Sequence, residues 1–268
     1  MIPALALAAV CEGSGMVLDP ARAGGLLLAD NEVSGHLLRA SVDGAMAGGS
    51  ADGVPLPFPV EDVEALAADG EAVWVVGSHS RNKAGDRKPL RDRIVQLQNG
   101  GSTLWRVDWT GCAACGDPAA PNHPGAGLNV EGAAVWNAQL WLGLRAPLID
   151  GGMAQLVELT PGVVSGVFSV RSSSIDLGGL AVRDLAVQPG ISGVLWILAG
   201  PASGKAPGAV YTLSGEGQVP TRLTLEVPAD AEGLVVLPDG GIRVLTDGAA
   251  KSDGTCKEPS VLYRLALR

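Results

Sequence analysis

A short phrase recurs along this chain at nearly constant spacing, and this repeat constrains the fold more than any other feature. Each copy opens a short apolar run, which is followed by a turn and a second apolar run. The copies begin at Glu64, Glu131, Arg183 and Glu232, with a weaker copy at Ser14. Successive copies are 50, 67, 52 and 49 residues apart, and the distance from the last copy through the C-terminus to the first is again 50. Repeats of this period with strand-like content are typical of propellers and solenoids, and a period that closes on itself favours a closed ring.

The apolar runs predict strands. They are four to seven residues long, many alternate with polar residues, and no segment has a sustained helical period. The third repeat divides into strands at 132–136, 139–145, 153–160 and 163–170, and the fourth into strands at 185–187, 194–199, 209–214 and 222–227. The sequence therefore predicts an all-β fold, a five-bladed β-propeller of four-stranded blades in a single domain over residues 1–268.

The last repeat lacks one strand. It supplies strands only at 234–237, 241–245 and 261–267, and we expect the segment 3–10 to complete this blade. Strands from both termini often share one blade, because the closed ring then leaves no sheet edge unpaired. The long second repeat holds its surplus in two predicted loops, 81–91 and 111–127. An alternative is a six-bladed ring, in which the 67-residue interval hides an extra half-blade.

Composition excludes several classes of function. The net charge of −9 argues against nucleic acid and anionic membrane surfaces, because both attract basic patches. No apolar run reaches the 18 or so residues that span a bilayer. Phosphate-binding glycine loops, the zinc-protease motif and the serine-hydrolase motif are absent from the sequence. We expect a monomer that binds a small-molecule ligand, anionic or an ester.

Register alone predicts where polar side chains meet. In a propeller the first strand of each blade lines the central channel, so the first residues of the five repeats form a ring at its mouth. These are Ser14, Glu64, Glu131, Arg183 and Glu232. The ends of the second strands bring further polar residues to the same face: Asp30, Asn31, Glu32, His79, Arg81, Arg145 and Asp247.

Three carboxylates around one axis repel each other, and this repulsion must be offset by other groups. One offset is a structural belt of salt bridges with Arg81, Arg145 and Arg183. A second is a hard cation such as Ca²⁺, which prefers carboxylate and carbonyl oxygens. The third is a ligand-filled pocket, in which the arginines hold an anionic group by paired hydrogen bonds.

Two residues are candidates for catalysis. His79, at a predicted strand end, suits a general base, although a histidine beside two serines is also typical of a hydrogen-bonded loop. Glu131 is the candidate carboxylate for positioning a water molecule.

The four cysteines are consistent with two disulfides or none, depending on the compartment. Cys112 and Cys115 have redox or half-zinc spacing, but no second pair completes a zinc site, so a local disulfide in the long loop is the best interpretation. Cys11 and Cys256 are predicted on one face near the ring closure, and a bridge between them would lock it. This pattern points to a periplasmic or secreted protein.

Several phrases of the chain, in this order, resemble a bacterial family known as domain of unknown function 3616. They are Cys-Glu-Gly-Ser-Gly at 11–15, Gly-Ser-His-Ser-Arg-Asn at 77–82, Asn-Val-Glu-Gly at 129–132 with Gly-Leu-Arg-Ala-Pro at 143–147, Arg-Asp-Leu at 183–185 with Ala-Gly-Pro at 199–201, and Glu-Gly-Leu at 232–234. The resemblance covers nearly the whole chain, with Gly13 and Gly15 as departures from the family's bulkier residues. The family is similar in outline to propellers that include esterase-like phytases and calcium-dependent lactonases.

Two functions follow as hypotheses. In the first, the pocket binds a small anionic or ester ligand and hydrolyses it, with water positioned by a carboxylate or a metal and the arginines stabilising the developing charge. In the second, the chain is a non-catalytic binding or interaction module, and the same ring is structural.

Overall fold

The fold is all-β. The computed structural model describes residues 4–7, 10–31, 33–46, 53–82, 84–116, 127–251 and 255–266. Within these residues the helical content is limited to two single turns of 3-10 helix, η2 (Trp109–Gly111) and η3 (Ala113–Cys115). No helix in the described part of the chain is long and apolar enough to cross a membrane.

The strands form antiparallel groups in chain order. The first group is β2 (Gly13–Leu18), β3 (Gly25–Asp30), β4 (His36–Ser41) and β5 (Val54–Pro55). The second is β6 (Val63–Asp69), β7 (Ala72–Gly77), β8 (Ile94–Gln98) and β9 (Gly101–Asp108), and the third is β10 (Asn129–Trp136), β11 (Gln139–Ile149), β12 (Met153–Pro161) and β13 (Val167–Ile175). The fourth is β14 (Ala181–Val187), β15 (Leu195–Gly200), β16 (Ala209–Leu213) and β17 (Thr221–Arg222).

The last group joins the two ends of the chain. It comprises β18 (Ala231–Val236), β19 (Ile242–Thr246), β22 (Val261–Leu265) and β1 (Ala4–Ala6). The N-terminal strand pairs antiparallel with the C-terminal one, with Ala4 opposite Tyr263 and Ala6 opposite Val261. The rest of the predicted strand at 3–10 is only partly described, since residues 3, 8 and 9 lie outside the described residues. A small additional pair, β20 (Ala249–Ala250) and β21 (Cys256–Glu258), was not predicted.

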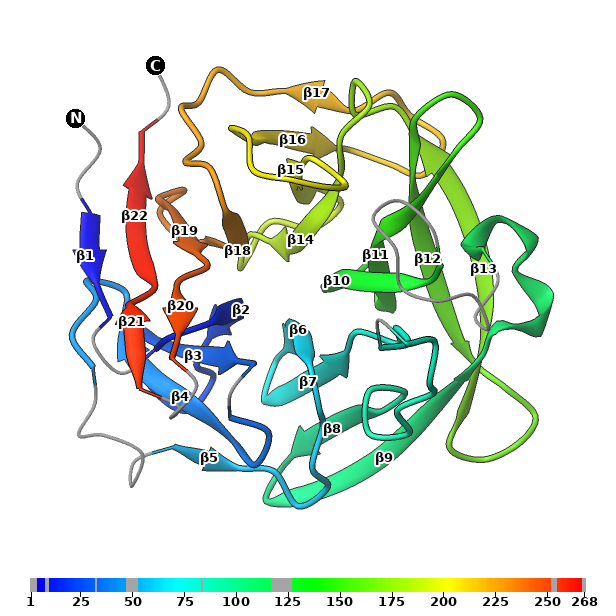
Figure 1. Cartoon of the computed structure of the whole chain (residues 1–268), viewed down its shortest axis with the longest axis horizontal. Coiled ribbons are helices and arrows are strands. Elements are labelled where there is room, and N and C mark those ends of the chain that lie inside the picture. Colours follow the sequence, from blue (N-terminus) through cyan, green and yellow to red (C-terminus); the bar gives the residue numbers. More distant parts are fainter. Residues whose placement is uncertain are drawn as a thin grey trace.

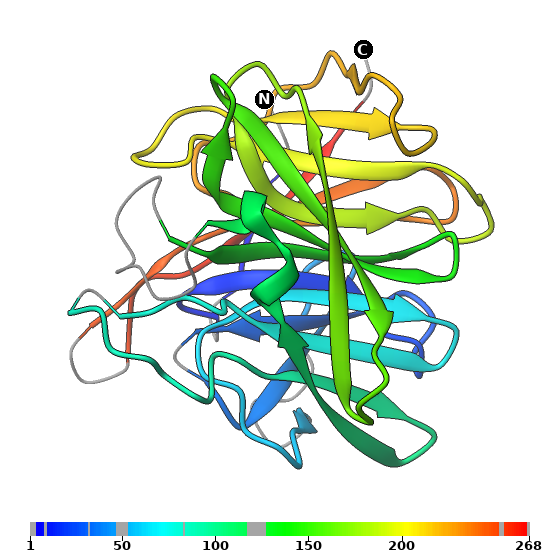
Figure 2. The ribbon, with the colours of Figure 1, turned by 90° about the vertical axis from the view of Figure 1, so that its right-hand side faces the viewer.

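The innermost strands surround a common centre (Figure 1). Each contacts the next in the order β2, β6, β10, β14, β18, and β18 contacts β2 again. These strands are buried almost throughout, whereas outer strands such as β9 alternate between more and less exposed residues. The described parts of the loop between β7 and β8 and of the loop between β15 and β16 project to one side, at the left in Figure 2, which is the face seen in Figure 1.

The core lies between neighbouring sheets. One apolar cluster joins the second and third groups through residues such as Val76 and Leu142, and another joins the third and fourth through Trp141 and Ile197. The second and third groups are also linked at their outer edges, where β9 and β13 pair in parallel. Such packing of apolar sheet faces accounts for the strongly hydrophobic composition.

Most predicted strands coincide with observed ones, and the outer strands deviate. The strand predicted at 163–170 begins only at Val167, because the segment 162–166 forms a turn with Gly166 at φ 74°. In place of the strand predicted at 222–227, the structure has the two-residue β17, which overlaps the prediction only at Arg222. The two predicted disulfides are both present, Cys11–Cys256 and Cys112–Cys115.

Candidate functional site

Every inner strand carries a β-bulge at the same position. In each of the five pairings with the second strand of the group, the register shifts by one residue and leaves one residue without a partner. The residues skipped are Ser14, Glu64, Glu131, Arg183 and Glu232. These are the five residues of the predicted ring. A bulge bends its strand and redirects the side chain of the extra residue, which explains why the repeat begins with a polar residue inside a buried strand.

Four charged side chains form a continuous salt-bridge belt. Arg183 Nη1 lies 3.0 Å from Glu131 Oε2, and Arg183 Nη2 pairs with Glu232 Oε1. Arg145 Nη1 lies 2.6 Å from Glu131 Oε1. The belt is largely buried, with Glu131 3% and Arg183 8% exposed. Burial lowers the pKa of Arg183, against the opposing effect of Glu131.

Neutral groups hold the belt in place. Asn129 Nδ2 donates to Glu131 Oε1 at 3.0 Å, and Arg145 Nε donates to the carbonyl of Ala202 at 3.0 Å. Ser14, the uncharged member of the ring, donates its hydroxyl proton to the carbonyl of Val63 on the neighbouring inner strand. Ser14 therefore links two strands and adds no charge to the belt.

Glu64 differs from the other acids of the ring. Its carboxylate accepts a hydrogen bond from Asn31 Nδ2 at 3.4 Å, and no ion pair to it is found within the described part of the chain. Burial raises the pKa of Glu64 well above its usual range, and the nearby Glu131 and Asp62 raise it further, while Arg183 and Arg145 act in the opposite direction. The environment of Glu64 thus favours its protonated form.

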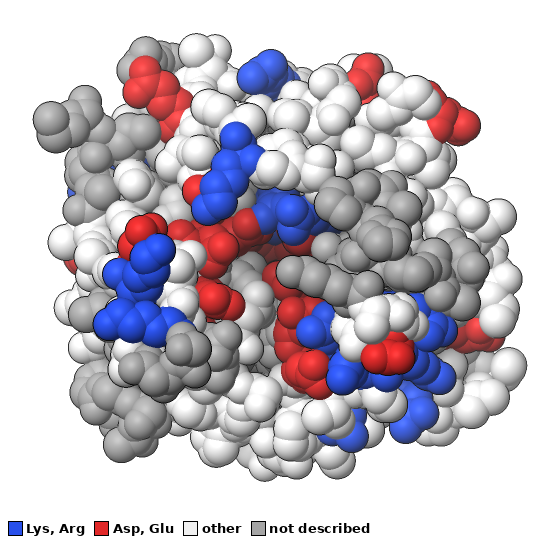
Figure 3. All heavy atoms as spheres, viewed as in Figure 1, with Lys and Arg blue, Asp and Glu red and all other residues white. Residues whose placement is uncertain are grey.

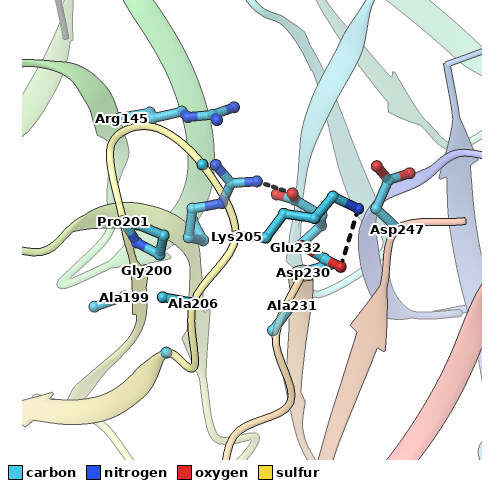
Figure 4. Close-up of a pocket in the computed structure, with 13 residues that line it drawn as sticks. Arg145, Ala199, Gly200, Pro201, Lys205, Ala206, Asp230, Ala231, Glu232 and Asp247 are labelled. Atoms are coloured by element: carbon cyan, nitrogen blue, oxygen red, sulfur yellow. Dashed lines mark hydrogen bonds and ion pairs between the residues drawn. The ribbon is translucent and has the colours of Figure 1, made fainter. Parts of the chain in front are cut away.

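A cavity of about 160 Å³ lies beside the belt (Figure 4). Its charged lining residues are Arg145, Arg183, Lys205, Asp230, Glu232 and Asp247. Figure 4 shows the side chain of Lys205 extending towards Asp230 and Asp247, and Lys205 Nζ lies 3.0 Å from Asp230 Oδ2. In the space-filling view, acidic side chains surround the centre of this face, flanked by basic ones (Figure 3).

Asp247 is an acid of this cavity with a raised pKa. Desolvation raises its pKa to about 6, the Glu12 carboxylate adds to the effect, and Gly248 N–H, Lys205 and Arg183 oppose it. The side chain is nevertheless exposed to solvent. A carboxyl group with this combination is a typical candidate for proton transfer.

Two predicted site residues lie elsewhere. His79 and Arg81 line a different cavity, together with Trp109 and Cys112, and Arg81 Nη1 donates to the carbonyl of Gly85 at 3.0 Å. They do not line the cavity beside the belt. The reason is local: the chain turns at His79, whose φ is 54°, and continues into the long loop.

Lys205 and Asp230 were not predicted as site residues. Lys205 lies in the loop between β15 and β16, and the repeat gives no signal at its position. Asp230 does have a sequence signal, because it lies two residues before the ring residue Glu232. Glu12, Asp62 and Asn129 lie at the same distance before Ser14, Glu64 and Glu131. The backbone carbonyls of Glu12, Asp62 and Asp230 accept hydrogen bonds from equivalent residues after the second strands. A polar residue at this offset is therefore a feature of the repeat that marks the mouth.

No group of three or more His, Cys, Asp and Glu side chains among the described residues is arranged to hold a metal ion. Glu32, one of the predicted residues of the mouth, lies outside those residues.

The fold and the ring define an all-β protein of the propeller-like class. The family model described as "Protein of unknown function (DUF3616)" matches residues 122–262, and the chain belongs to this family. No curated protein matches the sequence significantly.

Solved structures are similar to this chain at low sequence identity. The glutaminyl cyclase of Myxococcus xanthus is 16% identical, with a TM-score of 0.51, and the match covers 100% of this chain and 95% of that one. A proposed oxidoreductase (glucose dehydrogenase) from Thermus thermophilus is 14% identical, with a TM-score of 0.47, over 99% of this chain and 100% of that one. At this identity the likeness to the cyclase concerns the fold alone.

Proposed function

We propose that the chain is a five-bladed β-propeller, one domain over residues 1–268, and that its charged mouth binds a small anionic ester and hydrolyses it. The blade count is supported by the five groups of strands and by the closed order of contacts among their inner strands. Pairing of β1 with β22 supports closure of the last blade by the N-terminus.

The proposal depends on one observation: the acids of the belt are paired with its arginines, and Asp247 lies in a cavity that the partly exposed Arg145 and Lys205 also line. Arg183 and Arg145 neutralise Glu131 and Glu232. Arg145 is still 28% exposed in the cavity, and Lys205, 71% exposed, has an ion pair of the kind that contributes little and exchanges easily. The anionic part of a ligand can therefore contact Arg145 and Lys205 while Asp247 stays without an arginine partner among the described residues.

The proposed reaction is attack by water. Asp247, ionised above its pKa of about 6, accepts a proton as the water oxygen bonds to the carbonyl carbon or phosphorus. Arg145 stabilises the negative charge that develops on the ester oxygen. The bond to the leaving oxygen then breaks, and the alkoxide takes the proton back from Asp247. No other reactant is required.

The roles expected for Glu131 and His79 change in this proposal. Glu131 is bound on both oxygens by arginines, so we assign it a positioning role for Arg145 and Arg183. His79 has no part in this reaction, because it lines another cavity.

An activity screen with phosphomonoesters, small lactones and carboxylate esters tests the proposal. We expect turnover of at least one class, and we expect Asp247→Asn to lower kcat by about 100-fold or more. Arg222→Gln, which changes an exposed residue of β17, is the control. Parallel assays with Ca²⁺ and with a chelator test the calcium alternative. Absence of turnover with every class, or full activity of Asp247→Asn, would overturn the proposal.

The second candidate function is a non-catalytic binding module with a structural belt. The observation favouring it is that Arg183, only 8% exposed, is fully engaged with Glu131 and Glu232. Tight binding of a non-hydrolysable anion, combined with no turnover of any ester, would favour this alternative.

We also infer export to an oxidising compartment, supported by the two disulfides. Cell fractionation tests this inference. The monomeric state stays a prediction, for which sedimentation is the measurement.

A further inference from the structure

A second and larger cavity, of about 690 Å³, lies apart from the mouth. It is formed by the loop after β7, the end of β9 and the turns η2 and η3. Its walls combine apolar groups with charged ones: Val107, Trp109, Leu128, Arg81, Arg87, Arg106, Asp92 and Asp108. The proposed hydrolysis does not use any of these residues.

His79 in this cavity has a buried donor with no acceptor. Trp109 Nε1 donates to His79 Nδ1 at 3.4 Å, and the two rings meet edge to face with centroids 5.4 Å apart. Because Nδ1 accepts, the ring proton of the neutral histidine is on Nε2. The side chain is 4% exposed, and Nε2 has no hydrogen-bond partner. A buried donor without a partner costs about 1–3 kcal/mol, so native proteins rarely keep one without a reason.

The backbone adds to this cost. His79 has a φ of 54°, in the left-handed region that side chains other than glycine seldom adopt. Strained residues of this kind are concentrated at binding sites. Burial also lowers the pKa of His79 to about 4, with Asp92 opposing, so the ring is neutral near pH 7 and Nε2–H is a permanent donor there.

The charge of the lining favours an anion. Three arginines face two aspartates in a protein whose net charge is −9. Arg87, 65% exposed, pairs with Asp92 at 2.6 Å, and such an exposed pair is easily exchanged for a ligand. Basic side chains also gather at the lower right of the face in Figure 3.

We propose that this cavity is a second ligand site, which binds a small organic anion with an aromatic or apolar body. An anionic oxygen of the ligand accepts the His79 Nε2–H bond and lies near Arg87 and Arg106, while the apolar body packs on Trp109 and Leu128. The site is independent of the hydrolysis proposed for the mouth.

Phenylphosphonate is a suitable probe, because it cannot be hydrolysed as an ester and combines both features. The chain has three histidines, so imidazole NMR signals are few, and the signal missing from His79→Phe identifies His79. We expect phenylphosphonate to move the His79 Nε2–H resonance and to leave the other two histidines unchanged. Inorganic phosphate and benzyl alcohol, each carrying one feature only, should bind at least about tenfold more weakly.

Ligand affinities of variants, measured by calorimetry, distinguish a loss of ligand recognition from a loss of structure. His79→Gln keeps a donor near the position of Nε2 and should bind within about threefold of wild type, whereas His79→Phe should lose about tenfold or more. Arg87→Gln should weaken binding severalfold. Arg222→Gln, with the same charge change, and Asp247→Asn, at the mouth, should have no effect.

No movement of the His79 resonance at about 10 mM phenylphosphonate would overturn the proposal. So would equal affinities of His79→Gln and His79→Phe. If His79→Phe fails to fold, the wild-type NMR titration and the ligand affinity of Arg87→Gln test the proposal. A loss of binding in Asp247→Asn would place the ligand at the mouth and would also overturn the second site.

Discussion

Asp184 in β14 accepts a hydrogen bond from the backbone N–H of Leu234 in β18, with 2.6 Å between Asp184 Oδ2 and the nitrogen. Its other oxygen accepts from the N–H of Leu185 at 2.8 Å, and the N–H of Ala133 in β10 also donates to it. Asp184 is fully buried, and burial raises its pKa well above the ordinary range, against the effect of the three donors. One side chain thus joins three inner strands around the axis.

Replacing Asp184 by Ala should lower the free energy of unfolding by about 3 kcal/mol, because buried N–H donors lose their acceptor. Urea denaturation measures the loss. Asp176→Ala, which removes an exposed acceptor from Gly178 N–H, should cost less than about 1 kcal/mol. Equal losses in the two variants would mean that Asp184 does not hold the strands together.

Replacing Arg183 by Met should also destabilise the protein, by about 3–5 kcal/mol, since the buried Glu131 and the partly buried Glu232 lose their shared partner. The triple variant with Glu131→Gln and Glu232→Gln should recover much of the loss. Comparison of urea midpoints checks both expectations. A triple variant no more stable than Arg183→Met would contradict the claim that the unpaired acids of the belt cause the loss.

Glu64→Gln should stabilise the protein at pH 7. The folded state raises the pKa of Glu64, so the folded state favours the protonated form. The contribution of this group to stability is complete below its unfolded pKa, near 4.3, and is lost as the pH rises through the folded value. Glutamine stays neutral and avoids that loss. Thermal melts at pH 4 and pH 7 should show the gain at pH 7 only, and an unchanged melting temperature at pH 7 would contradict it.

The rate of the proposed hydrolysis should rise with pH through about 6. The general base must be ionised, and Asp247 loses its proton in this range. Asp247→Asn should remove this limb of the profile of kcat/KM. A limb that persists in the variant would assign the base to another residue.

The two disulfides should differ in their contributions to stability. Cys11–Cys256 spans 245 residues and Cys112–Cys115 spans 3. In the chain-entropy model, loss of the long bridge costs about 5 kcal/mol and loss of the short one about 2 kcal/mol. Paired Cys→Ser variants under otherwise equal conditions test this order. A greater effect of the short bridge would contradict it.

The repeat made much of the fold predictable because every copy meets the same physical demand. The inner strand needs a bulge that carries a polar residue, and in four of the five copies the next residue is small where strands approach closely: Gly15, Ala65, Gly132 and Gly233. A Cβ atom on Gly132 would lie 3.0 Å from the backbone of Asp184, and one on Gly15 would lie 3.3 Å from the Cα atom of Ala65. Both demands are local in sequence, so the pattern marks the five inner strands.

The outer strands were less predictable from the sequence, and so was the separation of the predicted site residues between two cavities. β17 has only two residues, although the apolar spacing predicted six. His79 and Arg81 were expected with Arg145 because all three follow second strands, but the turn at His79 and the long loop place them in another cavity. Lys205 reaches the mouth from a loop that has no repeat signal.

The sequence by itself predicted the all-β class, the positions of the inner strands, the five polar residues at their bulges and the two disulfides found in the structure, since each depends on periodicity or on spacing along the chain. Only the tertiary structure decided which charges meet. Arg183 lies between Glu131 and Glu232, Glu64 and Asp247 are left without an arginine partner among the described residues, and His79 lies apart. Ion pairing and desolvation depend on distances of a few ångströms, and residues some 50 positions apart acquire those distances only when the inner strands pack side by side.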